Sequence, residues 1–230
     1  MPQFAIYANP VATAPDRILL ALADAGFTDF DYVTVDMRGR EHKTPEYLAR
    51  NPFGKVPALV TNDGITMHES RAITRFLCTR LNLPLIPNPA TASAASQALF
   101  EQELSCETSY FEGPVSGVIW ETFIKRLIGM ETDDAAVVEH KKKLDDYFDI
   151  VEAKFKDSGK KFMAGEEYTL ADVYYLPFLA RLFDRGFGEL VTSRPHVKAW
   201  WERCMERPKT KAWIDQSPKL DLLLAKMEAK

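Results

Sequence analysis

The first 80 or so residues alternate between short apolar runs and a longer, nearly all-apolar stretch. Residues 4–8 and 30–35 each predict a strand. Between them, residues 17–25 predict a helix that Thr13 caps and that Gly26 ends. A strand, a helix of roughly 10 residues and a second strand form a βαβ unit, so we expect the two strands to pair in parallel.

Asn51 to Val60 is the stretch around which this part of the chain is organised. It opens with the turn dipeptides Asn-Pro and Phe-Gly, and its last five residues predict a short strand. Pro57 lies inside that strand without an N–H to donate, which favours an edge or a bulge. A cis bond before Pro57, which costs only ~1 kcal/mol at an X-Pro bond, would turn the backbone of Val56 towards a ligand.

A hairpin and a helix follow. Residues 61–64 predict the turn, residues 65–67 the returning strand, and residues 71–81 a helix that Glu69 and Ser70 open. A serine at a helix start presents a hydroxyl and free N–H groups, which favour an anion such as a carboxylate. From spacing alone, a tight turn, a hairpin and a capped helix without any ligand explain the pattern equally well.

The composition changes at residues 83–92, where prolines predict a stiff connector between domains. After it, residues 94–120 predict one long helix with a break or kink at Gly113-Pro114. A second long helix is predicted by a buried stripe at helical spacing, formed by Leu144, Tyr147, Phe148, Val151 and Phe155. We therefore expect an α/β domain over residues 1–82, in the order βαβ-α-ββα, and an all-α domain over residues 93–230.

Thr169 to Asp172 is a helix-start motif within the expected helical domain. Thr169 and Asp172 form a capping box, and the flanking Tyr168 and Val173 a hydrophobic staple; its simplest interpretation is structural. Residues 195–204 and 210–213 predict two short helices, and residues 219–230 a loosely held tail of mixed charge.

Composition narrows the class of protein. The 230 residues are 46% hydrophobic with a formal net charge of −4 and no basic stripe, which favours a soluble protein and argues against a nucleic-acid partner. No apolar run approaches the ~18 residues of a membrane span. The three cysteines (Cys78, Cys106 and Cys204) are too scattered for a disulfide framework, and the four histidines form no ligand pair. We expect a cytoplasmic protein that holds no metal.

Five motifs together resemble the phi class of glutathione transferases, and the resemblance runs along nearly the whole chain. They are Glu41-His42-Lys43, Asn51 to Leu59, Glu69 to Ile73, Thr132 to Val137 and Tyr168 to Asp172. The resemblance implies a thioredoxin-like first domain, a homodimer, and transfer of glutathione to small hydrophobic electrophiles, with hydroperoxides as a further substrate class.

The resemblance also implies the residues that bind glutathione: His42, Lys43, Lys55, Val56, Pro57, Glu69 and Ser70. Val56, next to a cis Pro57, would pair its backbone with the cysteinyl amide. Glu69 and Ser70 would hold the γ-glutamyl end, and the three cations would bracket the glycine carboxylate. Phe53 would insert into the partner subunit, although on its own it fits a core position equally well.

The group that activates the sulfur does not follow from the resemblance. The phi-class catalytic serine corresponds here to Ala12, which has no donor. Three substitutes remain: the hydroxyl of Thr13, the phenol of Tyr7, or the backbone N–H groups of residues 12 and 13 at the helix end. Arg17, on the same helix, either adds positive potential or forms a structural ion pair.

The electrophile is expected where the first helix faces the long helix of the second domain. The candidate apolar walls, of which at most half should line a pocket, are Val11, Ala12, Tyr110, Phe111, Ile119, Trp120 and Phe123. Two other functions stay open: a carrier of hydrophobic ligands with little turnover, and a scaffold like the elongation-factor gamma subunits. A thiol oxidoreductase is disfavoured because residues 11–13 contain no cysteine.

Overall fold

The computed structural model describes residues 2–216 of the chain. The chain divides into two compact units, Met1–Ile86 and Pro87–Lys230, and each is described by itself. This division falls within the proline-rich connector that the sequence predicts. The tail predicted over residues 219–230 lies outside the described residues.

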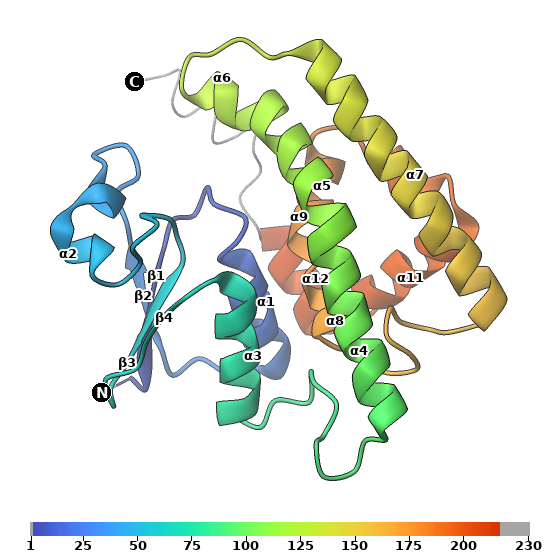
Figure 1. Ribbon diagram of the computed structural model, residues 1–230, viewed down its shortest axis with the longest axis horizontal. Helices are drawn as coiled ribbons and strands as arrows, with labels where there is room; N and C mark the ends of the chain where they lie inside the picture. Colours follow the sequence, from blue (N-terminus) through green and yellow to red (C-terminus); the bar gives the residue numbers. More distant parts are fainter. Residues whose placement is uncertain (1, 217–230) are drawn as a thin grey trace. The chain divides into compact units, whose positions relative to one another are not determined.

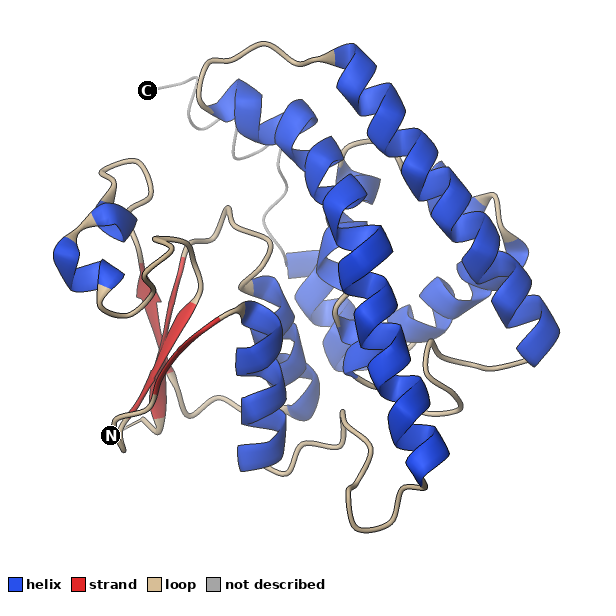
Figure 2. Ribbon diagram, viewed as in Figure 1, coloured by secondary structure: helices blue, strands red, loops and turns tan. Residues whose placement is uncertain are grey.

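The first unit is built on a four-stranded mixed sheet, drawn in red in Figure 2. Its strands are β1 (Phe4–Ala8), β2 (Asp31–Thr34), β3 (Ala58–Thr61) and β4 (Thr66–His68), in the order β2-β1-β3-β4. β1 pairs in parallel with β2, as the βαβ pattern predicts, and antiparallel with β3. β3 and β4 form the predicted hairpin, although β4 begins one residue later than expected.

The alternation of side chains along β1 gives this sheet two different faces. Phe4, Ile6 and Ala8 are buried with residues of α1 (Asp16–Ala25) and α3 (Ser70–Arg80). Tyr7 points the other way and packs against a small cluster that contains Tyr47. That opposite face carries η1 (Glu41–Lys43) and α2 (Pro45–Leu48), and Figure 1 shows α2 across the sheet from α1 and α3. The predicted order βαβ-α-ββα is confirmed.

The start of α1 differs from the prediction. The helix begins at Asp16, its N-cap position is Pro15, and no side chain caps it. Thr13 lies earlier, where its carbonyl accepts the Asp16 N–H at 3.0 Å in a lead-in turn. The expectation that Thr13 is the N-cap is therefore wrong. Gly26 ends the helix as predicted, with φ 73° in the left-handed region that glycine adopts without a steric penalty.

The second unit opens with one continuous helical rod: α4 (Ala94–Cys106), the π-helical turn η2 (Glu107–Phe111), α5 (Glu112–Ile119), the π-helical turn η3 (Trp120–Ile124) and α6 (Lys125–Leu127). A break or kink is predicted at Gly113-Pro114; the helix does not break there, because α5 continues through these residues. Proline has no N–H for the carbonyl four residues earlier, and its ring crowds that carbonyl. The wider π turn directly before it accommodates both effects.

The remaining helices are α7 (Asp134–Ser158), α8 (Leu170–Val173), α9 (Leu176–Asp184), α10 (Glu189–Thr192), α11 (Pro195–Met205) and α12 (Pro208–Gln216). α7 runs beside α5 in Figure 1 and buries the stripe from Leu144 to Phe155 that the sequence predicts. α11 and α12 confirm the two short helices. Among residues 2–216, no helix combines the length and the apolar character of a membrane span.

Asp172 joins several elements of this unit. Its buried carboxylate accepts the N–H groups of Met163 and Thr169 at 2.9 Å and the indole N–H of Trp200 at 2.8 Å. With the Thr169 side chain it completes the predicted capping box of α8. Burial raises the pKa of Asp172 to about 6, although these hydrogen bonds act in the opposite direction. The structural interpretation of this motif is confirmed.

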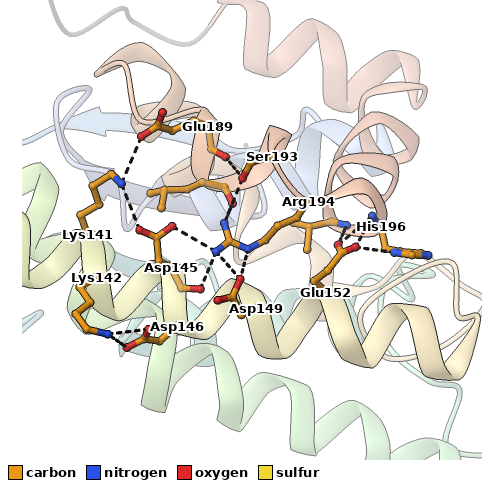
Figure 3. A network of polar contacts seen from close by, with 12 residues as sticks. Lys141, Lys142, Asp145, Asp146, Asp149, Glu152, Glu189, Ser193, Arg194 and His196 are labelled. Carbon is orange, nitrogen blue, oxygen red and sulfur yellow. Dashed lines mark hydrogen bonds and ion pairs between the residues drawn. The ribbon is translucent and has the colours of Figure 1, made fainter.

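Ion pairs on the outer side of α7 hold α10 and α11 against it (Figure 3). The Arg194 guanidinium donates to the Asp149 carboxylate at 2.8 Å and to the Leu190 carbonyl at 2.8 Å. Glu152 accepts the backbone N–H groups of His196 and Val197, each at 2.9 Å. A carboxylate from one helix therefore caps the start of another.

Candidate active site

The loop after β1 is organised by the side chain of Asn9. Its Oδ1 accepts the Val11 N–H at 3.0 Å, and its Nδ2 donates to the Val35 carbonyl at 2.9 Å. The Asn9 carbonyl accepts the N–H of Ala12 at 3.0 Å. Of the backbone N–H groups of residues 12 and 13, which form one of the three alternatives, that of Ala12 is therefore already engaged in a turn.

Thr13 keeps its donors. Neither its hydroxyl nor its N–H makes a hydrogen bond with another of the described residues 2–216. Thr13 lies three residues before Asp16, where α1 begins, in the turn that leads into the partially positive N-terminal end of the helix. A hydroxyl and an N–H thus remain available at the place where the resemblance puts the sulfur.

Tyr7 lies in different surroundings. Its ring packs below the guanidinium of Arg50, whose central carbon is 4.6 Å from the ring centroid. This contact is on the face of the sheet that carries α2, whereas α1, which follows Thr13, covers the opposite face. Tyr7 therefore points to the side of the sheet opposite to the one that α1 covers.

The turn before Val56 is held by two buried side chains. The Asn51 Oδ1 accepts the Phe53 N–H at 3.1 Å, and its Nδ2 donates to the Lys55 carbonyl at 2.7 Å. The Tyr47 hydroxyl donates to the same carbonyl at 2.9 Å. The backbone entering Val56 is thus fixed from α2 and from the turn itself.

Val56 itself has an unpaired backbone. The bond between Val56 and Pro57 is cis, as predicted, and β3 begins only after it. Within residues 2–216, no hydrogen bond involves the N–H or the carbonyl of Val56. Because backbone polar groups are almost always paired, an adjacent donor and acceptor without partners indicate a place for an extended peptide.

The predicted glycine-carboxylate cations gather around the same turn. The Lys43 ammonium donates to the Gly54 carbonyl at 2.8 Å, while Lys55 is exposed. A Cβ on Gly54, whose φ is 55°, would lie 2.8 Å from that ammonium and 2.8 Å from the His42 carbonyl, so glycine is required. Burial lowers the pKa of His42, and the neighbouring cations Lys43 and Arg40 lower it further. The structure places the Lys43 ammonium and the His42 backbone at this turn, and Lys43 is already engaged by the Gly54 carbonyl.

The start of α3 is left open. Glu69 precedes the helix with φ 70°, a strained conformation for a residue with a side chain, and makes no cap. The Ser70 hydroxyl accepts an N–H of Arg17 at 3.4 Å. Because Arg17 occupies an acceptor position of this hydroxyl, the Ser70 O–H is directed elsewhere as a donor. Arg17 is thus placed on the predicted carboxylate site.

Three residues that shape this site were not among those predicted from the sequence: Asn9, Tyr47 and Asn51. The two asparagines had a signal, since Asn-Pro favours an Asx turn in which the side chain bonds the backbone two residues on. Tyr47 had none, because its partner carbonyl lies eight residues away in the chain.

The predicted electrophile residues differ in exposure. Tyr110 and Trp120 are 63% and 43% exposed, and they belong to the π turns η2 and η3, a feature frequent at functional sites. Phe111 and Phe123 are fully buried and Ile119 nearly so. The Phe111 ring packs on the ring of Tyr175, with centroids 4.7 Å apart. Phe111 and Phe123 therefore belong to the helical core, and Val11 and Ala12 are half-buried in the first unit.

Phe53 is not a core residue. It is 64% exposed, and its ring lies edge-on to the ring of His68, with the two centroids 5.5 Å apart. Among residues 2–216, no group of three or more His, Cys, Asp or Glu side chains is arranged to hold a metal ion.

A mixed four-stranded sheet with helices on both faces, followed by an all-helical unit, defines a two-domain protein with a thioredoxin-like first domain. Residues 14–80 match the family model of the glutathione S-transferase N-terminal domain, and residues 94–208 that of the C-terminal domain. The chain belongs to the glutathione S-transferase family, and it is a phi-like enzyme of that family.

Individual relatives support the same family assignment. Glutathione S-transferase 3 of Zea mays is 37% identical over 226 residues, which cover 95% of this chain and 97% of the relative. Glutathione transferase F7 from Populus trichocarpa has a TM-score of 0.85 at 32% identity, covering 94% of this chain and 99% of that one. Maize glutathione S-transferase I, solved with an atrazine glutathione conjugate, has a TM-score of 0.83 at 30% identity. The match covers 94% of this chain and 100% of that one.

Proposed function

We propose that this transferase conjugates glutathione to small hydrophobic electrophiles. The observation that carries the proposal is the unpaired backbone of Val56 in the same unit as the open start of α3 at Ser70. The atrazine glutathione conjugate bound by the maize relative supports an aromatic or similarly apolar electrophile.

Glutathione binds as a short extended strand. The backbone of Val56 pairs with the cysteinyl residue, and Ser70 takes the γ-glutamyl carboxylate while Glu69 takes its ammonium. His42 and Lys55 face the glycine carboxylate, with Lys43 holding the turn between them. Within the second unit, Tyr110 and Trp120 are the exposed aromatic side chains among the predicted electrophile residues.

The reaction needs the thiolate of glutathione, because the thiolate is the nucleophile. A free thiol with a pKa of ~8.5 is only a few per cent ionised at neutral pH, and lowering that pKa by two units takes roughly 2.7 kcal/mol. The Thr13 hydroxyl and N–H, together with the end of α1, supply this preference for the anion. The proton leaves to solvent, the sulfur attacks an electrophilic carbon, and the leaving group departs as the C–S bond forms.

The ultraviolet absorbance of the bound thiolate, followed as pH is varied, tests the donor. Thr13→Val should raise the pKa of bound glutathione towards its free value and lower kcat/KM by about tenfold or more, because one charge-assisted hydrogen bond is lost. Thr13→Ser keeps a hydroxyl and should behave as wild type. If Tyr7→Phe raises the pKa and Thr13→Val does not, Tyr7 is the donor and this part of the proposal fails.

Turnover also separates the enzyme from a ligand carrier, which the named relatives do not favour. If the wild-type protein binds glutathione but forms no conjugate, the ligand-carrier function is favoured instead.

We further propose a cytoplasmic homodimer with Phe53 at its interface. An aromatic side chain 64% exposed supports the interface, and three free cysteines are consistent with a reducing compartment. Sedimentation of wild type and Phe53→Ser tests the dimer: equal masses for the two would remove Phe53 from the interface.

A further inference from the structure

Tyr47 carries a buried hydroxyl with a specific partner. Its ring is only 1% exposed and packs in the small cluster with Val35 and Ala58, on the α2 side of the sheet. Its oxygen donates to the Lys55 carbonyl at 2.9 Å. The packing requires only an apolar ring, so the hydroxyl must be explained separately.

The same carbonyl has a second donor. Asn51 Nδ2 lies 2.7 Å from it, so side chains from two elements occupy both lone-pair directions of this oxygen. The orientation of the peptide unit between Lys55 and Val56 is therefore fixed from one side by α2 and from another by the turn.

The consequence falls on the N–H of Val56, which belongs to this peptide unit. In a planar trans peptide the N–H points opposite to the carbonyl, so the two donors on the Lys55 oxygen aim the Val56 N–H away from the protein groups that hold it. That N–H has no partner within residues 2–216. Hydrogen bonds to the carbonyl also polarise the amide, which makes its N–H a stronger donor.

We infer that Tyr47 is a positioning residue for glutathione, whose hydroxyl holds the Lys55–Val56 peptide so that the Val56 N–H meets the cysteinyl carbonyl. The inference rests on the proposed function. Burial raises the pKa of Tyr47 to about 12, with Arg50 and Glu41 acting in opposite directions, so the phenol remains a donor at neutral pH. The ligand class is an extended γ-glutamyl-cysteinyl peptide with an acceptor carbonyl after the cysteine.

The test is steady-state kinetics of Tyr47→Phe, which keeps the ring and removes the hydroxyl. Its matched control is Tyr32→Phe, on β2 of the same sheet, since the Tyr32 phenol makes no hydrogen bond with another described residue. We expect the KM for glutathione to rise about threefold to tenfold, the effect of one hydrogen bond, while the KM for the electrophile and the pKa of the bound thiol stay unchanged.

An unchanged KM for glutathione overturns the inference. A fall in thermal stability with both KM values raised equally overturns it as well, because a purely structural role would act in that way. Asn51→Ser provides a second variant: serine can still accept the Phe53 N–H, but it cannot reach the Lys55 carbonyl. The same selective rise in the KM for glutathione is expected.

A ligand analogue locates the effect on one atom. Calorimetry measures the dissociation constants of two ligands. The first is S-methylglutathione, and the second is the same compound with a trans-alkene in place of the cysteinyl–glycine amide. Tyr47→Phe should weaken the first and leave the second unchanged, because the second has no carbonyl for the Val56 N–H. Equal weakening of both contradicts the inference. Wild type without glutathione binding would instead refute the proposed function.

Discussion

Two helix starts in this protein are built in opposite ways. At α8, Thr169 and Asp172 satisfy each other's backbone groups, and the carboxylate also takes donors from Met163 and Trp200. At α3, Glu69 makes no side-chain cap and holds φ at 70°, and the Ser70 hydroxyl is held by Arg17 with its own O–H directed elsewhere. Both starts were visible in the sequence as a polar residue before an apolar helix.

The difference shows what a helix start needs in order to leave donors available for a ligand. A helix start whose N–H groups are filled by its own side chains has no remaining donors for a ligand, and it stabilises the fold. A start left open, with strain in the preceding residue, keeps its donors and partial positive charge for an anion. The number of satisfied donors, rather than the residue types, distinguishes α8 from α3.

The largest effect on stability is expected at the start of α8, where the backbone N–H groups are satisfied by side chains. Asp172→Ala should lower the free energy of unfolding by about 4 kcal/mol, because it leaves several buried donors without an acceptor. Urea denaturation followed by tryptophan fluorescence measures the loss. Asp215→Ala, which removes an exposed carboxylate paired with Lys211 in α12, should change little. Equal losses for the two variants would show that the Asp172 contacts do not stabilise the second unit.

A substitution at the start of α3 should change the affinity for glutathione rather than the free energy of unfolding. Ser70→Ala is expected to raise the KM for glutathione about tenfold, the effect of one hydrogen bond to a charged group, while the unfolding midpoint stays within error of wild type. Ser193→Ala, on a surface turn beside Arg194, is the matched control. If Ser70→Ala lowers the free energy of unfolding without changing the KM for glutathione, the start of α3 is structural like that of α8, and the contrast between the two is wrong.

The smallest effect is expected at a third start, that of α11, which Glu152 caps from α7. Burial alone would raise the pKa of Glu152, but hydrogen bonds from the His196 ring and from the N–H groups of Val197 and His196 lower it. The stability that this carboxylate contributes is therefore present above its usual pKa of 4.5 and is lost as pH falls through the lower folded-state value.

Glu152→Gln should consequently lower the free energy of unfolding by about 1 kcal/mol at neutral pH, and the gap from wild type should close in acid. Urea midpoints at two pH values measure it. Glu139→Gln, in an exposed pair with Lys143, is the control and should show almost no gap. A gap at Glu152 that widens in acid would contradict the direction of the pKa shift.

Much of the fold was predictable because local patterns agreed with the tertiary arrangement. The alternating β1, the apolar α1 ended by Gly26 and the buried stripe of α7 each bury one face, and such periodicity is written in the sequence. Gly113-Pro114 predicts a break or kink from its local chemistry. In the structure α5 packs along α7, and the helix continues through these two residues after a π turn.

The resemblance predicts which residues bind glutathione, and the structure shows how the side chains of two of these positions are held. The Lys43 ammonium donates a hydrogen bond to the Gly54 carbonyl, and the Arg17 guanidinium donates one to the Ser70 hydroxyl. Neither contact has a local signal, because each partner is distant in sequence and the same side chains also fit a solvated surface.

The sequence by itself determined which segments become helices and strands, and it predicted where the chain divides and that Val56-Pro57 and Ser70 bind a ligand. Only the tertiary structure decided that the Ala12 N–H is already used, that Thr13 retains its donors, and that Tyr47 and Asn51 orient the peptide before Val56. The physical reason is that periodicity and turn chemistry act within a few residues. Hydrogen-bond satisfaction depends on which groups the folded chain brings together.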